Sequence, residues 1–169
     1  MEFNLTYRTP DVSLLSERFR VRKLDLKDVD IVYDMSSENG IFYKYHPPFV
    51  TKESILEDME ALPPNKNYDD KYYIGFFEND SLVAIMDLIL GYPTEETAFI
   101  GLFMTNVHYQ KKGVCSNIVA DVCDYLKKLN YKKIRIGVDK ENPQSNAFWL
   151  KNGFRIISEK EYRIMEFIL

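Results

Sequence analysis

The sequence predicts a single mixed α/β domain built on a mostly antiparallel sheet. Its 169 residues, of which 46% are hydrophobic and 28% charged, suffice for one domain with a sizeable core. Three strand-like runs follow one another within residues 71–105, and a strand–helix–strand pattern covers residues 98–138. Consecutive strands joined by short turns are typical of antiparallel pairing, whereas a strand–helix–strand unit predicts a parallel pair with a right-handed crossover.

The first part of the chain is interpreted as an N-terminal extension followed by the domain. Residues 1–17 lack a clear hydrophobic period, although a short strand is expected at residues 3–7. Polar and apolar side chains alternate over residues 18–24, as they do on a half-buried strand. The domain is therefore expected to span residues 18–169.

Two helices are expected after this first strand. Asp25 and Thr51 are good N-caps for them, and the helices should end near residues 39 and 62. The aromatic segment between them, residues 41–50, closes with a pair of prolines, so it is not expected to form the interior of a helix.

Strands and helices alternate from residue 71 onward. The strands are expected at residues 71–78, 81–90, 98–105 and 134–138, with two more after Phe154. A helix with apolar residues at helical spacing runs from Val114 to about residue 129. A shorter helix follows residue 138, with Ser145 or Asn146 as its N-cap. The two parallel strands should splay at their carboxyl ends, where ligand crevices form in such sheets.

The basic turn at residues 110–116 carries the clearest binding signal. Gly113 has no Cβ, so the backbone there can adopt a positive φ or approach a ligand oxygen closely. Lys111 and Lys112 add positive charge beside the unpaired N–H groups of a helix N-terminus, where a phosphate can bind. One glycine in a basic turn is also typical of an ordinary strand-to-helix loop, so this turn alone does not identify a ligand.

Two motifs together resemble the GNAT superfamily of acyl-CoA-dependent N-acetyltransferases. The pyrophosphate signature of that family, Gln/Arg-x-x-Gly-x-Gly/Ala, corresponds to residues 110–115, with Cys115 in place of the final Gly or Ala. Its second signature begins with Asn-x-x-Ser/Ala, ends in Gly-Phe and corresponds to residues 142–154. The motifs stand in the family's order and spacing, and the order of elements extends the resemblance to residues 18–169.

The resemblance implies both a fold and a cofactor. The fold is a mostly antiparallel sheet of about six or seven strands, splayed at the cofactor site, with about four helices. The implied cofactor is acetyl-CoA, whose extended, amide-rich pantetheine arm would pair with the backbone of the strand at residues 98–105. The residues expected to bind it are Phe103, Met104, Thr105, Gln110, Lys111, Lys112, Gly113, Val114, Cys115, Ser116, Asn142, Phe148 and Lys151.

The implied reaction is direct transfer of an acetyl group from acetyl-CoA to a primary amine in a ternary complex. Phe99 replaces the Glu that often serves as the base, so Asp87 and Glu96 are the candidate bases. Asp87 fits equally well as a solvent-facing residue on an alternating strand. Trp149 replaces a Tyr thought to protonate the departing thiolate, and an indole cannot donate a proton near neutral pH. Cys115 is discounted as a covalent nucleophile because a neighbouring pyrophosphate would raise its pKa.

The acceptor is expected to be a small-molecule amine or a protein amine. Tyr43, Tyr45 and His46 are candidates for the wall of its pocket, although these rings could equally fill the core beneath a loop. Because the usual Glu and Tyr are missing, an acyl-CoA-binding sensor or interaction module without turnover remains the alternative function.

Composition argues against several other classes of protein. A net charge of −4 and a pI of about 5.3 argue against a broad nucleic-acid-binding face. Cys115 and Cys123 would lie about 12 Å apart on one helix, too far for a disulfide, and two isolated His residues do not suggest a metal site. No membrane-spanning stretch or signal peptide is apparent, so a cytoplasmic location is expected. The oligomeric state stays open, with a homodimer as one option.

Overall fold

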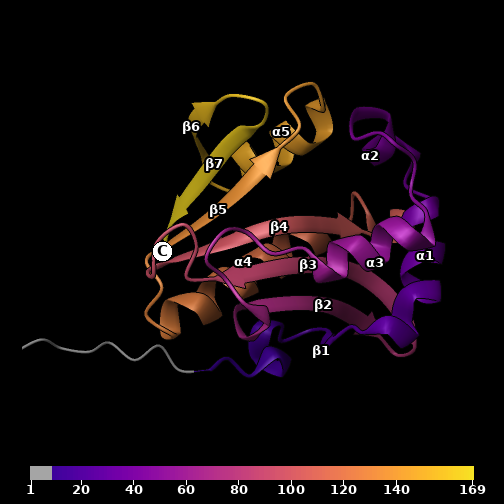
Figure 1. The fold of residues 1–169 in the computed structure, drawn as a ribbon, viewed down its shortest axis with the longest axis horizontal. Coiled ribbons are helices and arrows are strands. Elements are labelled where there is room, and N and C mark those ends of the chain that lie inside the picture. Colours follow the sequence, from indigo (N-terminus) through magenta and orange to yellow (C-terminus); the bar gives the residue numbers. More distant parts are fainter. Residues whose placement is uncertain (1–8) are drawn as a thin grey trace, which may run out of the picture.

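The computed structural model describes residues 9–169, which form a mixed α/β fold around one sheet (Figure 1). Within this part of the chain the sheet has seven strands in the order β1-β2-β3-β4-β5-β7-β6. They are β1 (Arg20–Lys23), β2 (Lys71–Glu78), β3 (Ser81–Leu90), β4 (Thr97–Thr105), β5 (Lys133–Val138), β6 (Arg155–Glu159) and β7 (Arg163–Ile168). Only β4 and β5 pair in parallel among the described strands, so the predicted mostly antiparallel sheet is confirmed. The strand expected at residues 3–7 lies outside the described residues.

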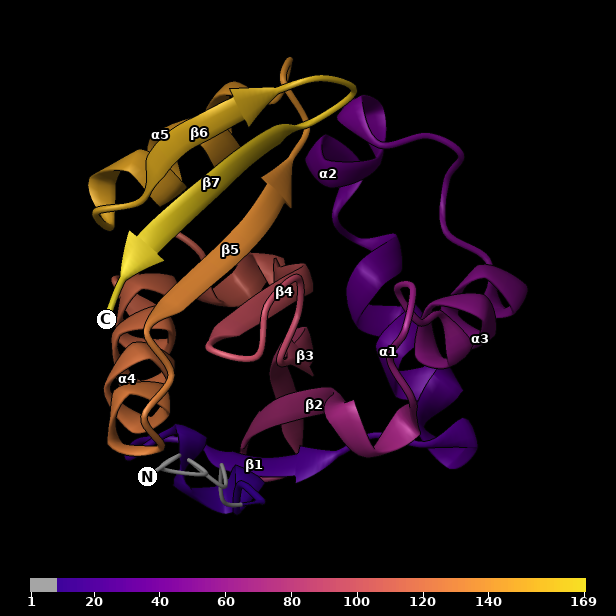
Figure 2. The same cartoon turned by 60° about the vertical axis from the view of Figure 1, so that its left-hand side comes forward.

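Helices cover both faces of the sheet (Figures 1 and 2). They are α1 (Val29–Ser37), α2 (Gly40–Tyr45), α3 (Lys52–Glu60), α4 (Val114–Lys128) and α5 (Pro143–Lys151). Apolar side chains of α1 and α3 pack with one face, where Val32 and Ile55 belong to one core cluster. Those of α4 and α5 pack with the other face, where Leu126 and Trp149 belong to a second cluster.

Local sequence signals explain where most helices begin. As predicted, Asp25 and Thr51 are N-caps: Asp25 caps a single 3-10 turn that leads into α1, and Thr51 caps α3. The structure adds that each cap is part of a capping box. The prediction that residues 41–50 are non-helical is wrong for the first half of this segment. Asn39 accepts a hydrogen bond from the N–H of Phe42 and starts α2, which ends before the first proline. The prolines therefore prevent only the continuation of this helix.

The predicted cap of α5 is also corrected by the structure. The side chain of Asn142, rather than that of Ser145 or Asn146, accepts a hydrogen bond from the N–H of Ser145 and caps the helix. Pro143 occupies the first helical position, where its missing N–H removes nothing from the helix. The sequence Asn-Pro therefore marks the helix start more reliably than the later polar residues.

Part of the predicted N-terminal extension packs against the domain. Leu15 belongs to the same core cluster as α4 and is only 1% exposed. The backbone N–H groups of Asp11 and Glu17 donate to Tyr125 and Asp121 on α4, at 2.9 and 3.1 Å. A boundary at residue 18 stays a prediction, but residues 11–17 contribute to the packed structure.

The sheet opens between β4 and β5, as Figure 2 shows. Residues 97–100 of β4 pair with residues 133–136 of β5, and the pairing between these two described strands ends at Ile100. At the same point the register between β3 and β4 shifts, so Gly101 is an extra residue on β4. Because the parallel pairing ends at this bulge, the backbone of β4 after Gly101 has no hydrogen-bonded strand on the side of β5.

Candidate functional site

A pocket of about 330 Å³ lies where β4 and β5 separate. It is lined by residues of three stretches that are far apart in the sequence, namely Asn39, Phe42, Phe103, Met104, Thr105, Gln110, Lys111, Gly113, Cys115, Ser116, Asn142, Gln144, Ser145, Phe148, Trp149 and Lys151. All residues predicted to bind the cofactor lie on its wall except Lys112, which is exposed outside it, and Val114, which is buried in the core. The structure therefore brings the two sequence motifs together at one cavity, although their binding role stays a prediction.

The basic turn before α4 leaves backbone N–H groups available at this pocket. Gly113 is the N-cap residue of α4 and has the left-handed conformation, with φ 76° and ψ 0°. The first hydrogen bond of the helix runs from the N–H of Asn117 to the carbonyl of Gly113, so the N–H groups of residues 114–116 have no intrahelical acceptor. No atom lies within 4 Å of the Cβ position of Gly113, so the space beside it is open. This arrangement suits an anion such as a phosphate.

Side chains of the turn fasten it to the end of β4. Gln110 donates from Nε2 to the carbonyl oxygen of Thr105 at 3.1 Å. The Cys115 thiol donates to the hydroxyl of Thr105, also at 3.1 Å. Burial raises the pKa of the Cys115 thiol, which keeps it in its poorly nucleophilic protonated form near neutral pH. Gln110 and Cys115 thus hold the turn in place.

The loop between β5 and α5 is held by buried amides. Asn146 donates from Nδ2 to the carbonyl oxygen of Asn142 at 2.7 Å and to that of Asp139 at 3.0 Å. Its amide oxygen accepts a hydrogen bond from Arg163 on β7 at 2.9 Å. These bonds fix the start of α5, where Asn142 and Ser145 line the pocket.

Trp149 is a packing residue that also borders the pocket. Its ring lies edge-on to three phenyl rings, with centroid separations of 5.9 Å to Phe103, 5.0 Å to Phe148 and 4.8 Å to Phe154. Such edge-to-face contacts stabilise a buried aromatic cluster. The residue that replaces the expected Tyr therefore has a clear structural role.

The two candidate bases lie in very different surroundings. Asp87 is 9% exposed, and its Oδ2 lies 2.8 Å from Nζ of the buried Lys71, so its interpretation as a solvent-facing residue is wrong. The reason is that β3 is buried on both faces. Burial raises the pKa of Asp87 more than Lys71 lowers it. Glu96 precedes β4 at the end opposite to residues 103–105 and lies 3.9 Å from Lys133, so it does not border the pocket.

The three residues predicted to line the acceptor pocket, Tyr43, Tyr45 and His46, do not lie together in the structure. Tyr43 packs its ring against Phe42 and Phe49, with centroid separations of 4.9 and 5.2 Å. Tyr45 lines a second pocket of about 400 Å³ that also involves Lys111. His46 lies with Nδ1 3.2 Å from the carboxylate of Asp139, which follows β5. This contact connects the end of α2 to the segment after β5, on the opposite wall of the opening.

Sequence reasoning missed several residues of the site. Asn39 and Phe42 line the main pocket because α2 begins beside it, and no helix was expected there. Lys71 and Tyr73 lie beside Asp87 because they belong to the neighbouring strand β2. Lys71 could have been suspected, because a lysine at the start of a buried strand needs a charged partner.

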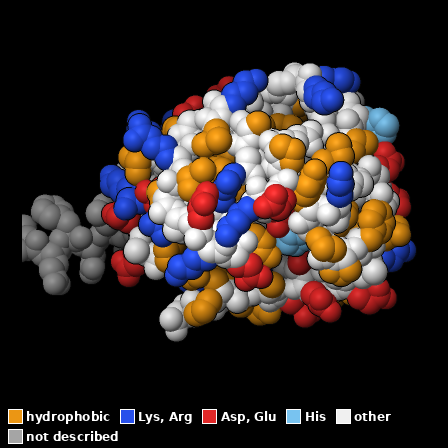
Figure 3. Space-filling model, turned by 90° about the horizontal axis from the view of Figure 1, so that it is seen from above, with side chains coloured by type: hydrophobic (Ala, Val, Ile, Leu, Met, Phe, Trp, Pro, Cys, Tyr) orange, Lys and Arg blue, Asp and Glu red, His pale blue; other side chains and the backbone are white. Residues whose placement is uncertain are grey.

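The surface that covers the top of the molecule carries both signs of charge. Figure 3 shows Lys and Arg side chains interspersed with Asp and Glu, with apolar groups between them.

None of the helices within residues 9–169 has the length and apolar character that a membrane span requires. The same residues contain no group of three or more His, Cys, Asp or Glu side chains placed to hold a metal ion.

Comparisons with known proteins agree with this geometry. Residues 38–154 match the sequence model described as the Acetyltransferase (GNAT) family. No curated protein matches the chain with significant sequence similarity.

Solved structures show the same fold. An acetyltransferase from Thermus thermophilus is 18% identical, with a TM-score of 0.76 over 92% of this chain and 97% of the other. The PaiA N-acetyltransferase from Thermoplasma acidophilum, in complex with coenzyme A, is 19% identical, with a TM-score of 0.69 over 89% and 99%. The ribosomal-protein-S18-alanine N-acetyltransferase from Escherichia coli is 14% identical, with a TM-score of 0.62 over 89% and 93%. At these identities the likeness concerns the fold.

Proposed function

Because the chain belongs to the acetyltransferase (GNAT) family, we propose that it transfers the acetyl group of acetyl-CoA directly to a primary amine. The observation that carries this proposal is the pocket at the β4–β5 opening. It combines a strand end without a β5 partner, a helix N-terminus with unpaired N–H groups and the start of α5. These are complementary to an extended amide-rich arm that ends in a pyrophosphate.

Residues on two sides of the pocket would hold acetyl-CoA. The N–H groups of residues 114–116 and the charge of Lys111 suit its pyrophosphate, and the open space beside Gly113 allows close approach. The backbone of residues 103–105 suits the pantetheine amides. When bound, acetyl-CoA supplies an activated thioester carbonyl that an amine can attack.

Asp87 is the residue that we assign as the base. A protonated alkylamine has a pKa of about 10.4, so only about one molecule in a few thousand is neutral at pH 7. A positioned carboxylate whose pKa is raised by burial is a better proton acceptor than an exposed one. Asp87 lies against Gly101, with Oδ2 3.0 Å from the Cβ position of that glycine, two residues before Phe103 in the pocket.

A second candidate is a CoA-binding sensor without turnover. Phe99 packs edge-on to Tyr92, and Trp149 packs edge-on to Phe103. Neither side chain can transfer a proton near neutral pH, so neither can do the work of the Glu or Tyr that the family often has at these positions. In this alternative the same pocket binds acetyl-CoA, but an amine is not acetylated.

Three further expectations stay predictions. They are the kind of acceptor, a small molecule or a protein; the possible homodimer; and the cytoplasmic location.

Thermal unfolding with and without acetyl-CoA tests the proposal, with ATP as the control ligand. Ligand at a hundred times its dissociation constant adds about 2.7 kcal/mol to the free energy of unfolding, which corresponds to roughly 5–10 °C for a chain of this size. Thiol release with a panel of primary amines then separates the two candidates. A shift without thiol release indicates the sensor, and no shift at millimolar acetyl-CoA contradicts both.

A further inference from the structure

The short helix α2 and the residues that flank it lie against both pockets of the site. We call this segment, residues 38–46, the α2 strap. Asn39 and Phe42 of the strap line the main pocket, and Tyr45 lines the second. Lys111 of the basic turn lines both pockets, so the two cavities adjoin at that turn. The strap therefore forms the wall that faces the basic turn.

Packing holds the strap less firmly than it holds the other walls of the main pocket. Every residue of α2 is at least partly exposed, and the helix has only six residues. By contrast, β4, α4 and α5 each contribute buried side chains to the core. Short helices are marginal on their own, and elements with few buried contacts open most readily. The position of the strap should therefore depend on its polar contacts.

Both histidines of the chain fasten the strap, one at each end. At its start, Oε2 of Glu38 lies 2.9 Å from Nε2 of His108, in the 3-10 turn after β4. At its end, Nδ1 of His46 lies 3.2 Å from both carboxylate oxygens of Asp139, just after β5. The chain has two histidines in all, and each pairs with a carboxylate between the strap and one wall of the opening. The strap thus joins the β4 wall to the β5 wall.

The titratable groups that face His46 come from three other parts of the chain. The side chain of Asp139, after β5, is only 18% exposed. Burial raises the pKa of Asp58 on α3, and the charge of His46 opposes that rise. The ring of Tyr162, between β6 and β7, lies 6.4 Å away, and burial raises the pKa of its hydroxyl, which stays neutral near pH 7. A protonated His46 therefore faces two carboxylates, whereas the group that faces His108 is Glu38.

These pairs make the position of the strap depend on pH, with a definite sign. Histidine is the side chain that ordinarily changes charge between about pH 5 and pH 8, a range in which carboxylates ordinarily stay ionised. A carboxylate at hydrogen-bond distance stabilises protonated histidine. The fastened strap therefore binds more protons than the released strap, so low pH favours fastening and the preference is lost as the pH rises.

We propose that the α2 strap is a pH-sensitive gate over the cofactor opening, fastened when His46 and His108 are protonated and released when they are neutral. This regulation rests on the function proposed above, because it controls how acetyl-CoA enters and leaves its pocket. The pair of His46 should dominate, and its loss should shift the balance toward the released strap by up to about tenfold. The side chains of His108 and Glu38 are 73% and 55% exposed, and such pairs contribute about fivefold at most.

Trp149 is a direct probe of the gate, because it is the single tryptophan of the chain and lines the main pocket. Acrylamide carries no charge, and its quenching of tryptophan fluorescence measures how accessible the indole ring is. In the full-length protein without ligand, the quenching constant should rise by up to about tenfold between about pH 5 and pH 8, as the strap is released.

Three variants and one control separate the gate from other effects of pH. His46→Gln should remove most of the pH dependence, and the double variant His46→Gln/His108→Gln, which has no histidine, should keep the high quenching constant throughout. Asp139→Asn should act like His46→Gln, because it removes the carboxylate that His46 contacts. The matched control is Glu141→Gln, which removes an exposed charge from the same loop and should behave as the wild type.

The dissociation rate of acetyl-CoA shows whether the gate acts on the cofactor. Rapid filtration of radiolabelled acetyl-CoA, chased with excess CoA, measures this rate. Near pH 5 we expect dissociation to be about tenfold slower from the wild type than from the double variant, and near pH 8 the two rates should agree. The cofactor phosphate also changes charge in this range, and the double variant measures that contribution alone.

The outcomes separate the gate from the proposed function. A wild-type quenching constant that is independent of pH overturns the gate, as does a double variant that keeps the wild-type pH dependence. If quenching depends on the histidines but acetyl-CoA binds at no pH, the gate stands while the proposed cofactor and function fall. If acetyl-CoA binds and is turned over, but dissociates from the wild type and the double variant at the same rate near pH 5, the function stands and the gate is wrong.

Discussion

Gly113 is the residue on which the anion-binding turn depends most directly. Its φ of 76° is a conformation that a residue with a Cβ adopts only with strain. We expect Gly113→Ala to lower the free energy of unfolding by about 1 kcal/mol and to reduce the thermal shift caused by acetyl-CoA, since the N–H groups of residues 114–116 would be displaced. Thermal unfolding with and without acetyl-CoA measures both effects.

Gly40 provides the matched control for this substitution. It begins α2, and no atom lies within 4 Å of its Cβ position. Because its φ is not positive, Gly40→Ala should leave stability unchanged or raise it slightly. If both variants keep the full acetyl-CoA shift, the left-handed turn is not needed for binding.

Cys115 distinguishes direct transfer from a covalent acetyl-enzyme. Burial raises the pKa of its thiol, and the thiol donates a hydrogen bond to Thr105. We expect Cys115→Ala to lower kcat by less than about tenfold, the scale of one lost hydrogen bond, whereas loss of a covalent nucleophile abolishes turnover. Steady-state thiol release measures the change. Complete loss of turnover with an unchanged acetyl-CoA shift would show instead that the thiol acts as a nucleophile.

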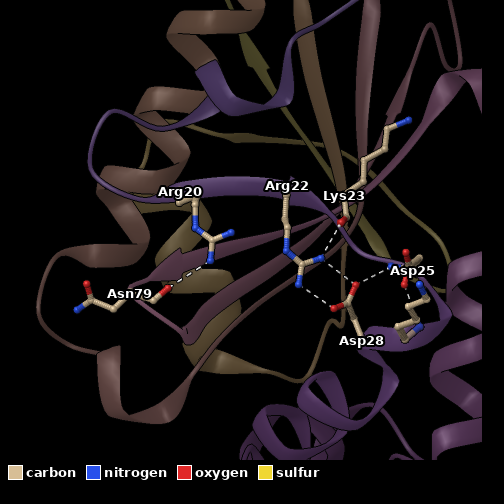
Figure 4. A network of polar contacts seen from close by, with 7 residues as sticks. Arg20, Arg22, Lys23, Asp25, Asp28 and Asn79 are labelled. Carbon is tan, nitrogen blue, oxygen red and sulfur yellow. Dashed lines mark hydrogen bonds and ion pairs between the residues drawn. The ribbon is translucent and has the colours of Figure 1, made fainter.

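An ion pair between Arg22 and Asp28 holds the turn before α1 against β1. Arg22 on β1 binds Asp28 through two hydrogen bonds, at 2.8 and 2.9 Å, and the N–H of Asp25 donates to the same carboxylate (Figure 4). We expect Asp28→Asn to lower the free energy of unfolding by about 1–3 kcal/mol at pH 7. The control is Asp30→Asn, whose exposed pair with Lys52 is screened by solvent and should contribute little.

The effect of Asp28 should disappear in acid, with a definite sign. Arg22 lowers the pKa of Asp28 in the folded protein below its ordinary value. The stabilisation is therefore fully present above the unfolded pKa of about 3.9 and is lost as the pH falls through the lower folded pKa. Denaturant unfolding of the wild type and of Asp28→Asn between pH 7 and pH 3 should show the two curves converging. A difference that grows toward acid would contradict this assignment.

Helix starts and turns could be predicted from short sequence signals, whereas sheet register could not. Asp25 and Thr51 act locally, and their roles as caps are confirmed. The tight turn at residues 79–80 alone would place Asp87 opposite Tyr72. A register shift near Phe77 places it opposite Tyr73 instead. No local residue pattern announces such a bulge, so this part of the site had to come from the structure.

At the scale of the whole molecule, the pocket lies between two parts of the sheet. One part is β1 to β4 with α1 and α3, and the other is β5 to β7 with α5. Only residues 97–100 of β4 pair with β5, and the contact of His46 with Asp139 spans the opening from α2. Two separate motifs indicated the family and its cofactor region, and the family match confirms the resemblance. The contribution of α2 could not be predicted because it arises from packing between distant segments.

This arrangement predicts where a bound cofactor should slow hydrogen exchange. A ligand that fills the opening contacts the end of β4, the start of α4 and the start of α5 at once, because all three line one pocket. At a hundred times its dissociation constant, acetyl-CoA should slow exchange by up to about a hundredfold for amides that open only in the free protein. Exchange mass spectrometry should show this at residues 103–105, 113–117 and 142–149, with β1 and the β2–β3 turn unchanged. Protection confined to residues 113–117 would mean that the ligand does not extend along β4.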